Sequence, residues 1–255
     1  MTLPVIKGSR QPPFPRPIDR GNPLTRGLFF ALVPIDAPPQ TISTASVVNR
    51  IDQFGQPAEY WSYGGGGGRP TFVVPTRSAS EWTFAAIGLP IDTTGFRVLA
   101  SFYDSANPGT AIHSLYSRAY SSGNAGAYSG IYQTGSTNGA TAWTAGTPAV
   151  TGVVFSGAAN AGAFYFGRRK ETSFALSATT ACTVDRVEMA TRQGSDASSA
   201  GNCVALLCGW NRALTDAEWQ SFADDPWQIF VPSVRNLWMG VAGAQPDTLW
   251  AQACL

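Results

Sequence analysis

Two short segments carry carboxylates that could act in catalysis or bind a metal ion. They are Asp104-Ser-Ala-Asn107 and Asp185-Arg-Val-Glu188. Glycoside hydrolysis needs two carboxyl groups directed at one cleft, but Asp185 and Glu188 are three residues apart, so on a regular strand they point to opposite faces. Neither segment has the spacing of a regular calcium loop, and Asp and Asn are common in turns. We therefore expect no catalytic pair, no metal and no cofactor, with calcium as the alternative.

Nucleophilic chemistry has little support. The one histidine, His113, lies in an apolar, strand-like segment, and no Gly-x-Ser-x-Gly elbow is present. Cysteines occur at positions 182, 203, 208 and 254 without a Cys-x-x-Cys pair, which argues against structural zinc. Cys203 and Cys208 are five residues apart on one predicted strand, so we expect them to face opposite sides and not to pair. Four reduced, buried cysteines would indicate synthesis in a reducing cytoplasm.

Carbohydrate binding is the chemistry that the sequence leaves open. Sugar sites combine aromatic faces with planar polar groups, and several aromatic residues lie in or beside Gly- and Ser-rich stretches. The alternative is that these rings fill the core or the loops. The candidates for sugar contacts are Tyr116, Tyr120, Tyr128, Tyr132 and Trp143.

The elements that must position these residues are strands. Apolar residues alternate from about residue 70 onward, as in Trp82, Phe84 and Ala86, and Gly-, Asn- and Ser-rich loops recur between the apolar runs. Predicted strands and helices do not alternate along the sequence, so a parallel α/β sheet is not indicated. The pattern predicts an all-β antiparallel sandwich. Its strands are expected near 28–33, 82–86, 98–102 (with Val98, Ala100 and Phe102 on one face), 150–156, 163–167, 183–190 and 203–210.

One short helix is predicted near the C-terminus. Thr215 and Glu218 form a capping box, in which the Thr215 hydroxyl accepts from the Glu218 N–H and the Glu218 carboxylate accepts from the Thr215 N–H. Leu214 and Trp219 flank the box, where a hydrophobic staple belongs. Pro226 marks the end of the helix.

The two ends of the chain differ from the middle. Nine of the 18 prolines lie in residues 1–40, and residues 1–26 hold five basic side chains against one acidic side chain. We expect an extended basic anchoring arm over 1–26, a jelly-roll domain over 27–230, and an apolar tail over 231–255 that packs on the body or on a neighbour. The predicted anchoring residues are Lys7, Arg10, Phe14, Arg16, Arg20, Trp227, Phe230 and Trp238.

Charge and hydropathy exclude two classes of partner. The net charge is +1, so the whole chain is not expected to bind nucleic acid. No apolar run approaches the length of a membrane span, and the N-terminus lacks the pattern of a secretory signal. Only 13% of residues are charged, which suits a subunit with much of its surface buried against other subunits.

The segment Trp210-Asn-Arg-Ala-Leu-Thr-Asp-Ala-Glu218 resembles the closing strand and helix of laminin-G-like, concanavalin A-like lectin–glucanase jelly rolls. Glu81-Trp-Thr-Phe-Ala-Ala-Ile87 resembles another strand of that family, and the resemblance covers about 70–230. Glucanases of this fold carry Glu-x-Asp-x-x-Glu on one strand, which this sequence lacks. Shorter motifs resemble laminin-G-like proteins of tailed bacteriophages and prophages: Ile6-Lys-Gly-Ser-Arg10, Asn22-Pro-Leu-Thr-Arg-Gly-Leu28 and Asp225-Pro-Trp-Gln-Ile-Phe230.

This resemblance implies a non-enzymatic virion protein of a tailed phage, made in the host cytoplasm. The expected role is a tail-associated fibre or adhesin-like appendage in host attachment, forming a homo-oligomer with other virion proteins as partners. A capsid decoration (cement) protein and a lectin-like carbohydrate-binding module that binds a host surface glycan are the alternatives. A polysaccharide-cleaving enzyme is the least favoured. Neither nucleic-acid binding nor membrane insertion is expected.

Overall fold

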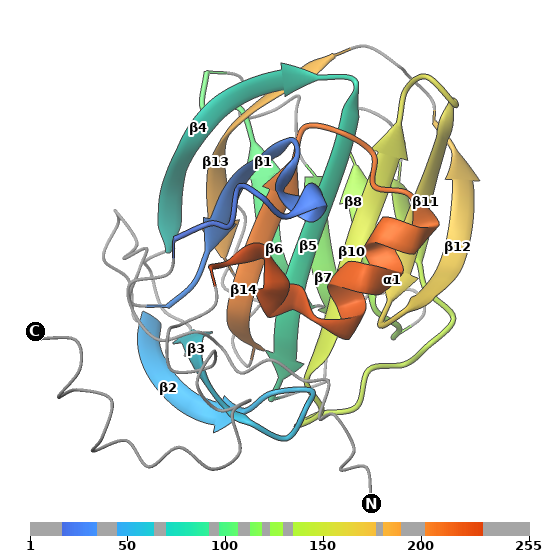
Figure 1. The fold of residues 1–255 in the computed structure, drawn as a ribbon. Helices are drawn as coiled ribbons and strands as arrows, with labels where there is room; N and C mark the ends of the chain where they lie inside the picture. Colours follow the sequence, from blue (N-terminus) through green and yellow to red (C-terminus); the bar gives the residue numbers. More distant parts are fainter. Residues whose placement is uncertain are drawn as a thin grey trace, which may run out of the picture.

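A computed structural model describes residues 17–34, 45–63, 70–91, 97–106, 113–118, 123–129, 135–176, 181–189 and 202–231. Two antiparallel sheets face each other, and one short helix, α1 (Asp216–Asp224), lies against the first of them (Figure 1). The predicted all-β antiparallel sandwich with one late helix is confirmed. No helix in the described ranges is long and apolar enough to cross a membrane.

The first sheet has the order β12-β11-β10-β5-β14-β3-β2, and β1 pairs with β14 beside this path. The second sheet has the order β4-β13-β6-β7-β8-β9. The strands of the first sheet are β1 (Leu28–Leu32), β2 (Ala45–Ile51), β3 (Pro57–Tyr63), β5 (Glu81–Pro90), β10 (Ala149–Ser156), β11 (Ala161–Phe166), β12 (Arg169–Ala175) and β14 (Asn202–Trp210). Those of the second are β4 (Thr71–Ala79), β6 (Arg97–Tyr103), β7 (His113–Arg118), β8 (Gly126–Ser129), β9 (Gly135–Asn138) and β13 (Cys182–Met189).

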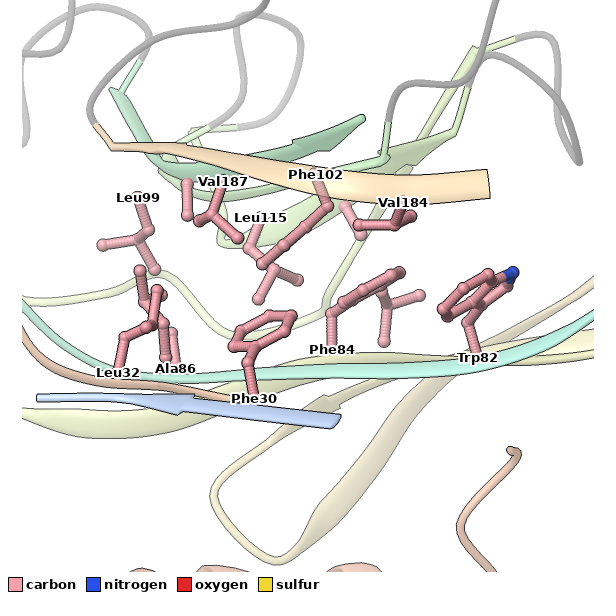
Figure 2. Packing of buried hydrophobic residues seen from close by; sticks show 14 of the residues in the cluster. Phe30, Leu32, Trp82, Phe84, Ala86, Leu99, Phe102, Leu115, Val184 and Val187 are labelled. Atoms are coloured by element: carbon pink, nitrogen blue, oxygen red, sulfur yellow. The ribbon is translucent and has the colours of Figure 1, made fainter. Parts of the chain in front are cut away.

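The main core fills the space between the sheets. Figure 2 shows side chains of β5 and β1 pointing at side chains of β6, β7 and β13. The rings of Phe84 and Phe102 stack with centroids 4.2 Å apart. Leu99 also enters this core, because the pairing of β6 shifts between Val98 and Ala100. Val98, predicted on the same face as Ala100 and Phe102, is buried outside this core cluster.

A second core lies on the other side of the first sheet, beneath α1 and the 3₁₀ turns η1 (Pro23–Thr25) and η2 (Pro226–Ile229). Trp219 of α1 stacks on Tyr165 of β11 with centroids 4.8 Å apart. Its ring also lies over Gly152 of β10, where an added Cβ would be 2.3 Å from it. Because both faces of the first sheet are buried, β14 is apolar along most of its length.

A bulge in β14 overturns the prediction that Cys203 and Cys208 face opposite sides. Both lie in the second core, because the pairing with β5 shifts between Val204 and Leu206. The extra residue reverses the alternation of side chains beyond it. Cys182, Cys203 and Cys208 are buried free thiols, as expected; Cys254 lies outside the described residues.

The start of the domain lies earlier than predicted. The N–H of Asp19 donates to the Ile229 carbonyl at 2.8 Å, and the Asn22 side chain donates to the Gln228 carbonyl at 2.8 Å. Trp210 donates to the carbonyl of Leu24 at 2.7 Å, and Leu24 is buried in the second core. Residues 17–26 are therefore part of the fold, and the prediction of a separate arm over 1–26 is wrong for them.

The segment after α1 packs on the body of this chain. Trp227 and Phe230 are buried in the second core, and Ile18 forms an isolated bridge with Phe230. Their side chains are thus used inside the molecule, so the prediction that they anchor another subunit is not supported. Beyond Val231 the predicted tail lies outside the described residues.

Candidate functional site

The aromatic residues predicted to contact sugar do not form an exposed platform. Tyr116 is fully buried, and its hydroxyl lies 3.0 Å from the carbonyl oxygens of Ala127 and Thr137. Trp143 is also buried, with its indole N–H donating to the Thr147 carbonyl at 2.6 Å. These two predictions are wrong because the rings are packed inside the domain. Tyr120 and Tyr132 lie outside the described residues, as does the side chain of Tyr128.

The structure describes only some of the predicted anchoring residues. Arg20 lies at the surface, and its guanidinium reaches the Leu28 carbonyl at 3.4 Å. Lys7, Arg10, Phe14, Arg16 and Trp238 lie outside the described residues.

The predicted capping box is present at the start of α1. The Thr215 hydroxyl accepts from the Glu218 N–H at 3.2 Å, and the Glu218 carboxylate accepts from the Thr215 N–H at 2.9 Å. Arg212 forms a 2.8 Å ion pair with Glu218. The hydrogen bond from Arg212 is the main reason that the pKa of Glu218 is lowered. This group stabilises the helix and has a structural role.

His113 is enclosed in the main core. It lies between the rings of Phe84 and Phe155, and Nε2 is 3.3 Å from the sulfur of Cys182. Burial lowers its pKa to about 3. These surroundings agree with the structural role expected for a lone strand histidine.

The polar group that the sequence did not reveal lies on the outer face of the second sheet. Val184 and Val187 both face the core although they are three residues apart (Figure 2). The pairing of β13 with β4 shifts between Val184 and Arg186, and this irregularity places Asp185 and Arg186 outside together. Glu188 lies between the core residues Val187 and Met189, so it also points outward.

The prediction that Asp185 and Glu188 lie on opposite faces is therefore wrong. Regular alternation over three residues would place them on opposite faces, but the irregular pairing with β4 leaves both on one face. The two carboxylates, together with Tyr103, Ser105 and Arg186, form what we call the β13 polar cluster.

Hydrogen bonds hold the β13 polar cluster in place. Asp185 accepts from the N–H of Ser105 at 2.8 Å and from its hydroxyl at 2.6 Å. Arg186 lies 3.2 Å from the Asp185 carboxylate, and the two side chains are 28% and 14% exposed. Tyr103 donates its hydroxyl to Oε1 of Glu188 at 2.7 Å. The loop after β6 and the irregular part of β13 are thus fixed to each other.

The charges of the cluster are partly balanced. Arg186 offsets one of the two carboxylates, which leaves one formal negative charge on the group. Burial is the main cause that raises the pKa of Tyr103, and the hydrogen bond to Glu188 adds to it, so the phenol stays a neutral donor. Oε2 of Glu188 is buried and has no hydrogen-bond partner among the described residues. Leaving such an atom unpaired costs free energy, and the cost needs an explanation beyond packing.

A hydroxyl pair continues the cluster across the sheet. Glu188 pairs in register with Ser101 of β6, and Ser101 pairs with Ser114 of β7. The two serine hydroxyls are 2.7 Å apart and buried. The outer side of the sheet therefore carries partly exposed carboxylate, guanidinium and phenol groups, and the serine hydroxyls beside them are buried. No group of three or more His, Cys, Asp or Glu suited to a metal ion occurs in the described part of the chain.

No protein-family model matches the chain, and no curated protein matches it. Among solved structures, it is similar to domain 4 of AbnA, a GH43 extracellular arabinanase from Geobacillus stearothermophilus, in complex with arabinotriose. The TM-score is 0.56 at 13% identity over 77% of this chain and 98% of that domain. It is also similar to a SAP-like pentraxin from Limulus polyphemus, with a TM-score of 0.46 at 15% identity over 57% of this chain and 70% of that one.

A third similar structure is the CBM40 of the IT-sialidase from Ruminococcus gnavus, bound to α2,3-sialyllactose. Its TM-score is 0.44 at 13% identity over 56% of this chain and 82% of that one. Of these three structures, the arabinanase domain alone scores high enough to support an argument, and at this identity the argument concerns the fold. The chain shares the β-sandwich fold of that arabinanase domain, and the resemblance to lectin-like, concanavalin A-like jelly rolls extends to this fold alone. The narrower resemblance to phage proteins stays a prediction.

Proposed function

We propose that this chain is a non-enzymatic carbohydrate-binding module whose ligand site is the β13 polar cluster. The observation that carries this proposal is the irregular pairing of β13 with β4, which brings Asp185, Arg186 and Glu188 to the outer face of the second sheet beside Tyr103. The outer face of the first sheet is closed by α1 and the 3₁₀ turns. The second sheet therefore offers the polar outer face on which a ligand can bind.

The chemistry of the cluster suits a polyhydroxylated ligand. Sugar hydroxyls both donate and accept, so they can donate to carboxylate oxygens and accept from a guanidinium. A tyrosine ring adds an apolar surface next to a polar group. The cluster is already hydrogen-bonded, and such preorganisation lowers the entropy lost on binding.

The contacts of both carboxylates favour binding over catalysis. Asp185 is occupied by Ser105 and Arg186, and Glu188 accepts from Tyr103. A hydrolytic pair needs one carboxyl group free to give a proton and another free to act as base or nucleophile. The similar arabinanase domain, which was solved with arabinotriose, shows that a fold of this kind can hold an oligosaccharide.

A glycan array tests this proposal. The purified protein is compared with Arg186→Ala and with Arg77→Ala, an exposed arginine on β4 of the same sheet. We expect the wild type and Arg77→Ala to bind the same glycans and Arg186→Ala to lose most of that signal. An array on which the wild type binds nothing, or on which Arg186→Ala binds as the wild type does, would overturn the proposal.

For the biological setting, we propose a tailed-phage virion that is assembled in the host cytoplasm. The short motifs around Asn22 and Asp225 support this setting through their resemblance to phage proteins. The module would belong to a tail-associated fibre or adhesin-like appendage, with a capsid decoration protein as the alternative. Quantitative mass spectrometry of purified particles distinguishes them, because a decoration protein is present in far more copies than a tail part.

A further inference from the structure

One edge strand of the first sheet has an unpaired side among the described strands and carries exposed apolar side chains. β2 pairs with β3 and with no other described strand. Val47 and Ile51, on the same face of β2, are 46% and 53% exposed. An edge strand with unpaired backbone groups and exposed apolar side chains is a template for pairing with another strand. In Figure 1, β2 and β3 are the light-blue strands at one end of the sheet.

The direction of the free backbone groups follows from the turn between β2 and β3. Ile51 lies opposite Pro57, which has no N–H and so cannot exchange two hydrogen bonds with it. The Asp52 N–H donates to the Gln56 carbonyl at 2.8 Å. Hydrogen-bonded and non-hydrogen-bonded pairs alternate along an antiparallel ladder. Even-numbered residues of β2 therefore bond to β3, and odd-numbered residues direct their N–H and C=O groups to the open edge.

One side-chain contact agrees with this assignment. The Arg50 guanidinium donates to the carbonyl of Asn49 at 3.0 Å, as expected if that carbonyl is not used by β3. The arginine thus covers the carbonyl of Asn49. The Ile51 carbonyl accepts a long 3.4 Å bond from the Tyr60 hydroxyl, and the side chains of Val47 and Ile51 stay exposed.

The odd-numbered residues of β2 in one copy can pair with the odd-numbered residues of β2 in a second copy. If two β2 strands pair antiparallel with Asn49 at the centre, Asn49 of one copy lies opposite Asn49 of the other. Val47 of each copy then lies opposite Ile51 of the other copy, which gives two Val–Ile pairs. All of these are residues whose backbone groups face the edge, so each pair can exchange two hydrogen bonds. The two Val–Ile pairs also cover the exposed apolar side chains with cross-strand contacts.

Three other edge strands, β12, β4 and β9, carry features that hinder such pairing. β12 begins with Arg169 and Lys170, both exposed and charged. β4 contains Pro75 and the exposed Arg77, and β9 is only four residues long. Charges, proline and short length are the usual protection of edge strands.

We propose that two copies of this chain associate through antiparallel pairing of their β2 strands, centred on Asn49, so that the two first sheets form one continuous sheet. The proposal does not depend on the proposed sugar site. A dimer of this kind would carry two β13 polar clusters and bind a multivalent ligand more tightly than one copy.

Sedimentation equilibrium over a wide range of protein concentration tests the interface. The wild type should form a dimer. Val47→Lys should raise the dimer dissociation constant at least about tenfold, because both Val–Ile pairs are lost. Val73→Lys on β4 is the matched control, since Val73 is 45% exposed, and it should leave the constant unchanged. A wild type that stays monomeric, or a dimer equally stable in Val47→Lys and Val73→Lys, would overturn the proposal.

Disulfide cross-linking tests the register and does not require a weakened variant to fold. In a Cys254→Ser background the three described cysteines are buried, so an added thiol at the edge is the reactive one. Asn49→Cys should give a covalent dimer on mild oxidation, because residue 49 meets its own copy. Val48→Cys should not, because it lies opposite Arg50. Equal cross-linking of both variants, or none with Asn49→Cys, would contradict the register.

Discussion

The bond between Tyr103 and Glu188 links two strands of the second sheet through one short contact. The hydroxyl is 2.7 Å from Oε1, while Oε2 of the same carboxylate is buried without a partner among the described residues. Removing the hydroxyl would leave both oxygens without this support. The stability of the β13 polar cluster therefore depends on this phenol as well as on the Asp185–Arg186 pair.

Tyr103→Phe should lower the free energy of unfolding by about 1–3 kcal/mol, the usual cost of leaving a buried acceptor unpaired. Tyr60→Phe is the comparison, because the Tyr60 hydroxyl makes only a long 3.4 Å bond to the Ile51 carbonyl. Chemical denaturation of the two variants measures the difference. If Tyr103→Phe cost no more than Tyr60→Phe, the Tyr103–Glu188 bond would not be formed in solution.

His113 predicts a dependence of stability on pH. Its pKa is lowered to about 3 in the folded chain and is about 6.5 in an unfolded one. Between these values the unfolded state binds a proton that the folded state does not, so stability falls as the pH falls. From pH 7 to pH 5 this contribution is about 2 kcal/mol.

The variant His113→Gln isolates this effect from that of carboxylates such as Glu218. This variant should have a lower free energy of unfolding than the wild type at pH 7. The difference between the two free energies should be smaller by about 2 kcal/mol at pH 5. Urea denaturation at both values measures the gap. An unchanged gap would mean that His113 is protonated in the folded protein.

At the scale of single residues, the sequence predicted the local contacts and missed the long-range ones. The Thr215–Glu218 capping box was predictable because both partners are three residues apart on one helix. Tyr116 and Trp143 were misassigned because aromatic residues beside Gly-rich loops also fill cores. Asp185 and Glu188 were predicted on opposite faces, because the irregular pairing of β13 with β4 is a long-range feature that the local sequence does not show.

At the scale of elements, strands buried on at least one face were predictable from their apolar patterns. β5, β10, β11, β13 and β14 all lie close to their predicted positions. β12, Arg169-Lys-Glu-Thr-Ser-Phe-Ala175, has few apolar residues and was missed. Exposed edge strands need no apolar alternation, so their sequences carry little signal.

The segment before β1 gives a test at this scale. A chain that starts at Pro17 keeps the contacts of Asp19, Asn22 and Leu24 with η2 and β14, and a chain that starts at Gly27 loses them. We expect the shorter chain to melt several degrees below the longer one, since about 1 kcal/mol shifts the Tm by about 2–4 °C for a domain of this size. Calorimetry of both chains decides. Equal melting temperatures would mean that residues 17–26 do not stabilise the domain and belong to the anchoring arm.

At the scale of the whole molecule, the two outer faces of the sandwich have different roles. The outer face of the first sheet is apolar and is covered by α1, η1 and η2. The outer face of the second sheet carries the β13 polar cluster. Because the chain's own helix covers one face, we propose the other face as the one that binds a ligand. The sandwich was predictable from the sequence, but this division was not, because it depends on which sheet α1 packs against.

The account also predicts that the protein does not cleave the glycans it binds. Asp185 and Oε1 of Glu188 are held by neighbours, and Oε2 of Glu188 is buried, so neither carboxylate is placed to exchange protons with a substrate. Incubation with each glycan that binds on the array, followed by an assay for new reducing ends and unsaturated products, should show no turnover. Sustained turnover that Glu188→Gln abolishes would make the chain an enzyme.

Titration calorimetry tests the central claim most directly, with the glycan that gives the strongest array signal as ligand. The wild type should bind one glycan per chain. Arg186→Ala should weaken the dissociation constant at least about tenfold, equivalent to about 1.4 kcal/mol, while Arg168→Ala on the α1 side of the sandwich should bind as the wild type does. Unchanged affinity in Arg186→Ala would contradict the assignment of the β13 polar cluster as the sugar site.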